Sequence, residues 1–418
     1  MLCYWIPVCE MNMLSVQEWR SQFPIFQTNM NGYPLIYLDS AATTQKPQIV
    51  IDSIVEHLST ANANVHRGVY ELSQIATDRF EQTRNRIQQF IHANSPTEII
   101  FTKGATEAIN LVASSYGELA FEEHDEIILT LMEHHANIIP WQEIAKKKGC
   151  IIKVVPISMN GTLCMEDYAS MFTEKTKFVS MVWVSNAIGV ENPIKQCIDI
   201  AHSHGVPILV DASQAIQHKK IDVQSLDCDF LVFSGHKVYG PTGTGILYGK
   251  SSILDRMPPY QTGGDMIRKV TFEKTTFADL PSKFEAGTPN IEGFIGLGTA
   301  IQFLQQISID DITNHELALM NHAIKLIEQK EYIKVIGYNG TNVSALSFSM
   351  DGVHPHDIAS LLDRKGIAVR AGHHCAHPLM QFYGVPSTTR ISFALYTTVE
   401  EIEECIEALD EIHTLFHA

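Results

Sequence analysis

The sequence predicts an α/β protein in which a mostly parallel sheet is covered by helices and is followed by a smaller α+β domain. Short apolar runs, such as 126–131 and 207–211, alternate with helix-like segments through the first two thirds of the chain. Strands that are apolar along their whole length are typical of a sheet buried on both faces. A polar stretch with Gly and Pro at 281–290 indicates a crossing into the second domain.

The order of the elements follows from the same patterns. Strands are expected at 98–102, 126–131, 150–157, 177–185, 207–211, 230–233 and 245–248. Between them, helices are expected at 106–116, 137–148, 165–172 and 193–204. After the crossing, helices are expected at 292–305, 313–329, 355–365 and 400–414, and strands at 343–350 and 390–396.

Composition narrows the class of protein. The 418 residues are 45% hydrophobic and 18% charged, which is typical of a globular protein with room for two or three domains. The net charge of −17 argues against nucleic acid or an anionic membrane as a partner. The sequence contains no run of 18 apolar residues, so no membrane span is predicted. The apolar start, 1–9, lacks a basic flank, so we interpret it as an extension rather than a signal peptide.

The eight cysteines form no C-x-x-C pair and are irregularly spaced. At this chain length they do not suggest a disulfide scaffold. We therefore expect reduced thiols and a cytoplasmic protein.

Lys237 is the first candidate for chemistry. It follows the apolar strand 230–233 and precedes a Gly-rich run at 240–245. Burial disfavours the ammonium form, so such a lysine can attack the carbonyl of an aldehyde cofactor such as pyridoxal phosphate. Taken alone, Lys237 is explained more simply as a solvated lysine in a turn.

Asp211 is the second candidate, because it ends the apolar strand 207–211. A side chain at that end of a strand faces the crevice where α/β proteins bind ligands. Beneath a pyridoxal ring its carboxylate would keep the ring nitrogen protonated. A helix-capping aspartate is the alternative.

Two further turns carry polar side chains. The segment 102–107 (TKGATE) lies between a strand and a helix, where free backbone N–H groups can cradle a phosphate, although the motif is common. The segment 132–137 (MEHHAN) contains His134, whose imidazole could stack on a flat cofactor. Paired histidines are more often structural residues or metal ligands.

The segment 370–378 (RAGHHCAHP) has three histidines around Cys375. Zinc is one interpretation, but ligands this close in sequence cannot easily surround one tetrahedral ion. A nucleophilic thiol, kept ionised by Arg and protonated His nearby, is the second, and a surface cysteine is the third. Arg390 enters a strand, and its planar fork suits a carboxylate, although a structural ion pair explains it equally well.

Together and in this order, the motifs resemble the fold-type I pyridoxal-phosphate enzymes of the class V aminotransferase family. Among these, the chain closely resembles the group II, Suf-type cysteine desulfurases, which also act as selenocysteine lyases. The segment 370–378 discriminates best, because group I enzymes place their cysteine on a longer loop. The matching segments are YLDSAA at 37–42, VHRG at 65–68, MEHHAN at 132–137, WVSNAIGVENP at 183–193, VDASQA at 210–215, FSGHKVYGPTGTGILY at 233–248, FEAGTPN at 284–290 and RAGHHCAHP at 370–378.

The resemblance covers the chain from about Met13 and implies a domain plan. It comprises an extension at 1–12, an N-terminal segment near the small domain at 13–36, a large cofactor domain with a seven-stranded type of sheet at 37–290, and a small domain at 291–418.

The resemblance also implies the roles of individual residues. Lys237 binds the cofactor and carries protons, His134 stacks on the ring, and Cys375 accepts sulfur; these three are catalytic. The cofactor-binding residues are Ala105, Thr106, His134, Asn186, Asp211, Gln214, Ser234, His236, Lys237 and Thr288. Many relatives have Thr where this chain has Ala105. The substrate-binding residues are His66, Asn186, Arg370 and Arg390. The family donates the residue at Thr288 from the other subunit, which implies a homodimer. No metal is expected.

The implied activity converts L-cysteine to L-alanine and leaves the sulfur as a persulfide on Cys375. A Suf-type acceptor protein would then collect it for iron–sulfur cluster assembly. Selenocysteine lyase is the main alternative. An aminotransferase or a kynureninase-like hydrolase is disfavoured by the segment 370–378, and a non-enzymatic scaffold is hard to reconcile with intact motifs.

Overall fold

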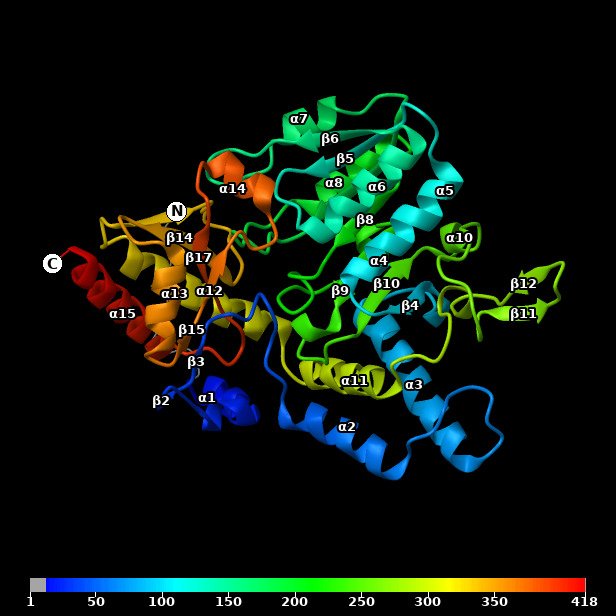
Figure 1. Ribbon diagram of the computed structural model, residues 1–418, viewed down its shortest axis with the longest axis horizontal. Helices are drawn as coiled ribbons and strands as arrows, with labels where there is room; N and C mark the ends of the chain where they lie inside the picture. The colour runs from blue at the N-terminus through cyan, green and yellow to red at the C-terminus, as the bar shows by residue number, and fades with distance from the viewer. Residues whose placement is uncertain (1–12, 418) are drawn as a thin grey trace.

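The computed structural model describes residues 13–417, so the extension predicted at 1–12 lies outside the described residues. Its large body is built on a sheet of seven strands (Figure 1). In spatial order they are β4 (Ile99–Thr102), β10 (Gly245–Gly249), β9 (Phe230–Ser234), β8 (Ile208–Asp211), β7 (Thr176–Val182), β5 (Glu126–Thr130) and β6 (Ile151–Val155). Only β10 among them runs antiparallel to its neighbours, which confirms the predicted mostly parallel sheet.

Burial on both faces explains the apolar strands. Every residue of β8 and β9 is buried, and alternate side chains of β9 enter different cores. Leu231 and Phe233 pack in the core beneath α3 (Glu71–Phe90) and α8 (Ile194–Ser203). Phe230 and Val232 pack in the core beneath α4 (Ala105–Leu111) and α6 (Ile139–Lys148). The sheet is therefore the middle of three layers.

Helix α11 (Ile291–Gln305) belongs to the large body, where it packs against α3 and α2 (Gln48–Thr60). The sequence placed this segment at the start of the small domain. Small residues allow the close packing, since a Cβ on Gly298 would lie 2.3 Å from Oγ1 of Thr83. The chain leaves the large body after α11 rather than before it.

The small body holds an antiparallel sheet in the order β13 (Ile333–Ile336), β14 (Ala345–Met350), β17 (Thr388–Ser392) and β16 (Arg370–Gly372). Helices α12 (Ile309–Ile327), α13 (Pro355–Asp363) and α15 (Val399–His417) cover it, with a core of their own. Short β13 and β16 were not expected from the sequence, because neither has a long apolar pattern.

The N-terminal segment lies against the small body. After α1 (Met13–Ser21), strand β3 (Ile36–Tyr37) pairs in parallel with β15 (Ile367–Ala368). Leu38 continues this path, donating its N–H to Ala368 O and accepting from Ser392 N, both at 2.9 Å. The segment therefore places residue 39 between the large body and the small body.

A hairpin of β11 (Ile267–Val270) and β12 (Thr275–Phe277) projects from the large body at the right of Figure 1. Within residues 13–417, no helix is long and apolar enough to cross a membrane.

Candidate active site

A cavity of about 240 Å³ opens where the large and small bodies meet, at the carboxyl ends of the parallel strands. It brings together every predicted site residue except His66 and Thr288. Its walls are Ala41, Ala42, Ala105, Thr106, His134, Ala136, Val182, Asn186, Asp211, Ser213, Gln214, Ser234, His236, Lys237, Arg370, His374, Cys375 and Arg390.

Lys237 lies on a short 3-10 helix directly after β9. Burial lowers the pKa of its amine to about 8, and the charge of Arg390 acts in the same direction while that of Asp211 opposes it. With this pKa about a tenth of the amine is neutral at pH 7, far more than for an ordinary lysine, and the neutral form is the one that attacks a carbonyl.

Asp211 stands at the end of β8 with its side chain buried. Its Oδ1 accepts from Ser213 N at 2.9 Å. Among the described residues nothing donates to Oδ2, so one carboxylate oxygen is free to hold a protonated ring nitrogen. The geometry suits the predicted role better than a helix cap, because Asp211 lies on the cavity wall.

His134 is held by its own backbone turn, in which its Nδ1 accepts from Ala136 N at 3.0 Å. Burial lowers the pKa of this imidazole to about 4, with the nearby Lys237 charge adding to the effect. The ring is therefore neutral with its proton on Nε2, and its flat face can stack on a flat cofactor ring.

The turn 102–106 forms the far end of the cavity. Gly104 precedes α4, and the next residue, Ala105, donates its N–H to Ser234 Oγ at 2.9 Å. The strand β10 approaches this turn closely, since a Cβ on Gly245 would lie 2.3 Å from Gly104 Cα. The Thr106 and Ser234 side chains line the resulting pocket, as a phosphate cradle requires.

Arg370 and Arg390 approach each other from adjacent strands of the small body. Their carboxylate partner is Asp39, a residue of the 37–42 motif for which no role was predicted. Arg390 Nη1 also donates to Asn186 O at 2.6 Å. The Asn186 side chain, predicted to hold substrate, also donates to His374 O at 2.6 Å and so supports the cysteine loop.

Cys375 lies on the loop 373–376, between β16 and α14 (His377–Tyr383). Its backbone is held on both sides, since Cys375 O accepts from His135 N at 2.7 Å and the His374 ring hydrogen-bonds Thr388 Oγ1 at 2.8 Å. Both His374 and Cys375 have positive φ, +53° and +56°. Each such residue costs about 1 kcal/mol or more, which is typical of a functional loop held under strain.

Of the six cysteines described, Cys375 alone is exposed. The others are partly or fully buried, and burial raises the pKa of the Cys197 and Cys405 thiols to about 12. Those thiols are protonated and enclosed, so they are poor nucleophiles.

The loop histidines stack rather than converge on a point. The rings of His135 and His377 are stacked, and His377 also stacks on His373. Within the described part of the chain, no three His, Cys, Asp or Glu side chains are grouped so that they could hold a metal ion.

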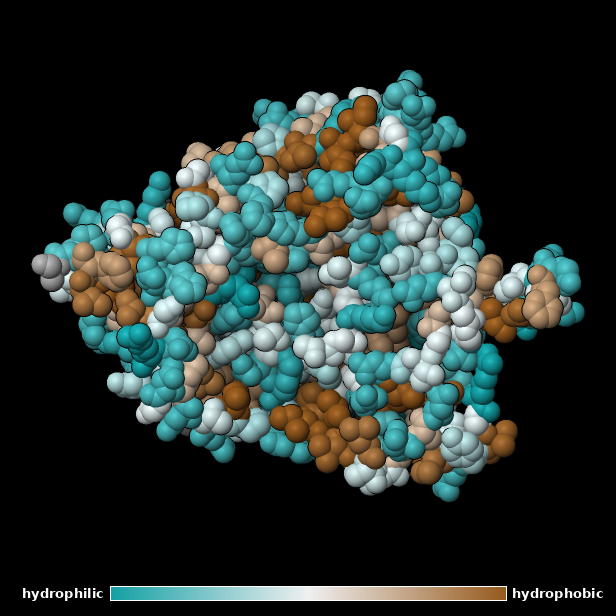
Figure 2. All heavy atoms as spheres, viewed as in Figure 1, coloured by the Kyte–Doolittle hydropathy of each residue, from teal (hydrophilic) through white to brown (hydrophobic). Residues whose placement is uncertain are grey.

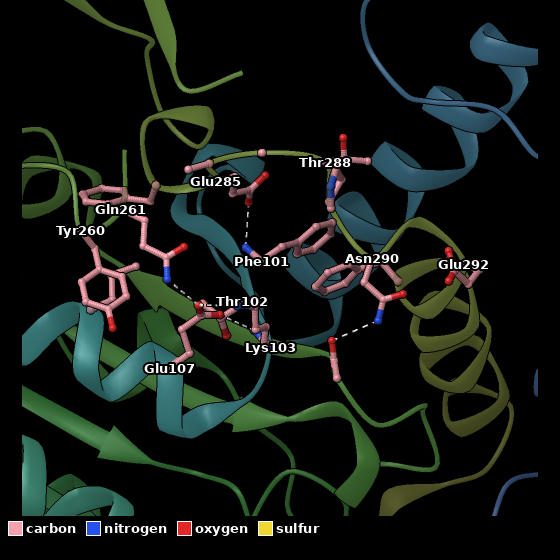
Figure 3. Close-up of a pocket in the computed structure, with 17 residues that line it drawn as sticks. Phe101, Thr102, Lys103, Glu107, Tyr260, Gln261, Glu285, Thr288, Asn290 and Glu292 are labelled. Atoms are coloured by element: carbon pink, nitrogen blue, oxygen red, sulfur yellow. Dashed lines mark hydrogen bonds and ion pairs between the residues drawn. The ribbon is translucent and has the colours of Figure 1, made fainter. Parts of the chain in front are cut away.

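Thr288 lines a separate cavity of about 460 Å³, whose walls also include Thr102 and Lys103 (Figure 3). The loop that carries Thr288 is anchored to β4 by Glu285, whose carboxylate accepts from Phe101 N at 2.7 Å. His66 pairs with Glu81 at 3.1 Å and lines a small pocket that also touches Gly287. Both residues therefore lie together on one surface, away from the Lys237 cavity of their own chain.

Comparisons with known proteins agree with this geometry. Residues 36–405 match the family described as Aminotransferase class-V. A probable cysteine desulfurase of Halalkalibacterium halodurans is 48% identical over 403 residues, which is 96% of this chain and 99% of that protein.

Two solved structures are also similar. The cysteine desulfurase CsdA of Escherichia coli is 36% identical with a TM-score of 0.90, over 97% of this chain and 100% of that one. The cysteine desulfurase of Thermococcus onnurineus is 35% identical with a TM-score of 0.91, over 99% and 100%.

Proposed function

Because the chain belongs to the class-V aminotransferase family and is a pyridoxal-phosphate-dependent cysteine desulfurase, we propose that Lys237 and Cys375 together convert L-cysteine to L-alanine. The observation that carries the proposal is that the one exposed thiol described lines the same cavity as a lysine with a depressed pKa. A lysine alone would serve any enzyme of the family, whereas the thiol is needed to accept sulfur.

The residues of the cavity fit pyridoxal phosphate. The free oxygen of Asp211 suits the ring nitrogen, the neutral His134 suits one face of the ring, and the Thr106 turn suits the phosphate. Gln214 donates one amide hydrogen to Ala41 O at 2.8 Å and keeps another for the ring oxygen. When bound, this cofactor supplies an electron sink for the charge that develops at the substrate α-carbon.

Lys237 is the proton carrier of this proposal. Its neutral amine removes the α-proton of bound cysteine and later returns a proton to the carbon skeleton. A pKa of about 8 lets it act in both directions near neutral pH. Asp211 keeps a negative charge where the ring nitrogen must stay positive.

Cys375 is the sulfur acceptor. Its thiolate attacks the sulfur of bound cysteine, so a new S–S bond forms while the Cβ–S bond breaks and its electron pair stays with carbon. The substrate carbon is reduced to the methyl group of alanine, and the thiol is oxidised to a persulfide. Atoms and electrons balance without a further reagent.

The test is Cys375→Ser with both L-cysteine and L-selenocysteine. A serine hydroxyl stays protonated and is a poor sulfur acceptor, so release of alanine from cysteine should fall by about a hundredfold or more. Selenium leaves more readily, so selenocysteine cleavage should fall much less. Wild-type rates from cysteine in this variant would refute the role of Cys375, and equal losses with both substrates would refute the selenocysteine lyase alternative.

A homodimer is part of the proposal. His66, predicted to bind substrate, and Thr288, predicted to bind the cofactor, can serve a Lys237 cavity only from a second copy. The surface around His66 is apolar: Val69, Tyr70 and Leu72 are exposed. Further apolar side chains gather over α2 at the lower edge of Figure 2. Val55 and Leu58 of this helix are exposed. Sedimentation should therefore give a dimer.

The persulfide must leave before the next turnover, because it occupies the nucleophile. We therefore propose that a Suf-type acceptor protein collects the sulfur. We also propose a role in iron–sulfur cluster assembly and a cytoplasmic location. A purified acceptor should raise the turnover rate without changing cofactor content.

A further inference from the structure

Asp39 lies between the two arginines of the cavity, although no step proposed above uses it. Its Oδ1 accepts from Arg390 Nη2 at 3.0 Å and from Arg370 Nε at 3.1 Å, while its Oδ2 accepts from Arg370 Nη2 at 2.9 Å. The Asp39 side chain is 15% exposed and that of Arg390 only 2%. One carboxylate is thus shared by two guanidinium groups.

The strand register makes this carboxylate necessary. Arg370 and Arg390 stand directly opposite each other in the β16–β17 pair. Like charges in that position repel, and a buried guanidinium without a counter-ion is costly. Asp39 offsets both effects, and it does so from a backbone that is itself fixed, since Leu38 bridges β15 and β17.

The contacts of Arg390 show what remains for a ligand. A guanidinium has five N–H donors in one plane. Nη1 donates to Asn186 O and Nη2 to Asp39. These two hydrogen bonds fix the orientation of the guanidinium plane of Arg390. Among the described residues, the buried Nε has no hydrogen-bond partner. Two arginines and one aspartate leave a single positive charge, which matches one carboxylate.

On the basis of the proposed function, we infer that Asp39 is a positioning residue for the substrate α-carboxylate. It fixes the plane of Arg390 and restrains Arg370, and so determines how tightly the amino acid binds. It does not contact the reacting carbon or sulfur. Removing its charge should let the two guanidinium groups separate, with Arg370 turning outward because its side chain is already 46% exposed.

The test is Asp39→Asn in the full-length holoenzyme, with L-cysteine and a reductant. KM should rise about tenfold or more while kcat changes less than about threefold, because only binding of the carboxylate is impaired. The absorption of the bound cofactor should not change. Titration with L-alanine, followed by that absorption, should show an affinity weakened by the same factor as KM.

Two matched variants complete the test. Asp199→Asn removes the charge of an exposed ion pair with Lys195 on α8 and should change neither constant. In Arg370→Met the repulsion is already gone, so adding Asp39→Asn releases only the plane of Arg390 and should raise KM by a smaller factor than it does in the wild type. An unchanged KM in Asp39→Asn, or equal effects of that change in both backgrounds, would overturn the inference.

A second substitution at the same position keeps the inference testable if Asp39→Asn does not fold. If Asp39→Asn loses the cofactor or precipitates, Asp39→Glu keeps the charge but moves it by one methylene. KM should then rise with kcat retained, and an unchanged KM would contradict the positioning role. A wild type that does not desulfurate cysteine would refute the proposed function alone, because alanine affinity would still measure the effect of Asp39.

Discussion

Lys237, Asp211 and His134 stand at the ends of buried parallel strands, whereas Cys375 stands on the loop 373–376. The first group is fixed by the large body, and the lowered pKa values of Lys237 and His134 come mainly from burial. Cys375 is exposed, has a positive φ and is held mainly by neighbouring backbone contacts. The difference matches the two tasks of the proposed function, in which the strand ends hold charges in place while the loop takes up sulfur and releases it.

The largest effect on the rigid group is expected from Lys237→Ala. This variant should lose covalent cofactor binding and all measurable turnover while the fold stays soluble, because no other described lysine lines the cavity. Absorption spectra and alanine release measure the two losses. A variant that still bound the cofactor covalently would contradict the role of Lys237.

Asp211→Ala should come next. Its carboxylate matters most when charge develops at the α-carbon, so turnover should fall by about a hundredfold or more while cofactor affinity falls much less. Kinetics and equilibrium dialysis separate the two quantities. If turnover survived within a few-fold, Asp211 would be only a turn-forming residue that caps Ser213 N.

These two predictions rest on residues that the sequence itself singled out. The strands β8 and β9 could be predicted from the sequence because their residues are buried on both faces and are therefore apolar. Parallel strands bring their carboxyl ends together, so the residues that follow these strands could be predicted to share a site. The pairing of β16 with β17 could not be predicted from the sequence, because it depends on contacts between short segments that lack a clear strand pattern. The same is true of Asp39, whose partners are more than 300 residues away.

The position of α11 was missed for a related reason. The polar stretch before it resembles a domain linker, but α11 is buried along almost its whole length against α2 and α3. Its predominantly apolar sequence, rather than the linker, was the signal for a place in the large body.

A smaller effect is expected on the loop side from His135→Ala. The His135 ring accepts from His377 N at 3.1 Å and stacks on the His377 ring, so its loss should loosen the loop. Desulfuration should fall about three- to tenfold with cofactor content unchanged. His204→Ala, which removes a ring stacked on Phe172 far from the cavity, is the control. Equal effects of the two variants would refute a role of the stack.

The smallest effect concerns stability. Glu133 is fully buried behind His134, accepting from Asn137 Nδ2 at 2.6 Å and Val182 N at 3.0 Å. Burial raises the pKa of this carboxyl to about 8. Its folded form therefore binds a proton more tightly than its unfolded form, and its contribution to stability is full at low pH and declines as pH rises toward 8.

Glu133→Gln removes this titration, so denaturant unfolding of the variant should depend less on pH between about 5 and 8 than that of the wild type. Parallel profiles for the two proteins would contradict the raised pKa of Glu133.

The central claim is that sulfur is accepted by the thiol on the strained loop. Wild-type protein given L-cysteine without a reductant should gain the mass of one sulfur atom per chain. Peptide mass spectrometry should place it on the peptide that contains Cys375, because the other described thiols are partly or fully buried and none of them lines the Lys237 cavity. The extra sulfur on a peptide with Cys150, Cys164, Cys197, Cys228 or Cys405 instead would contradict the account.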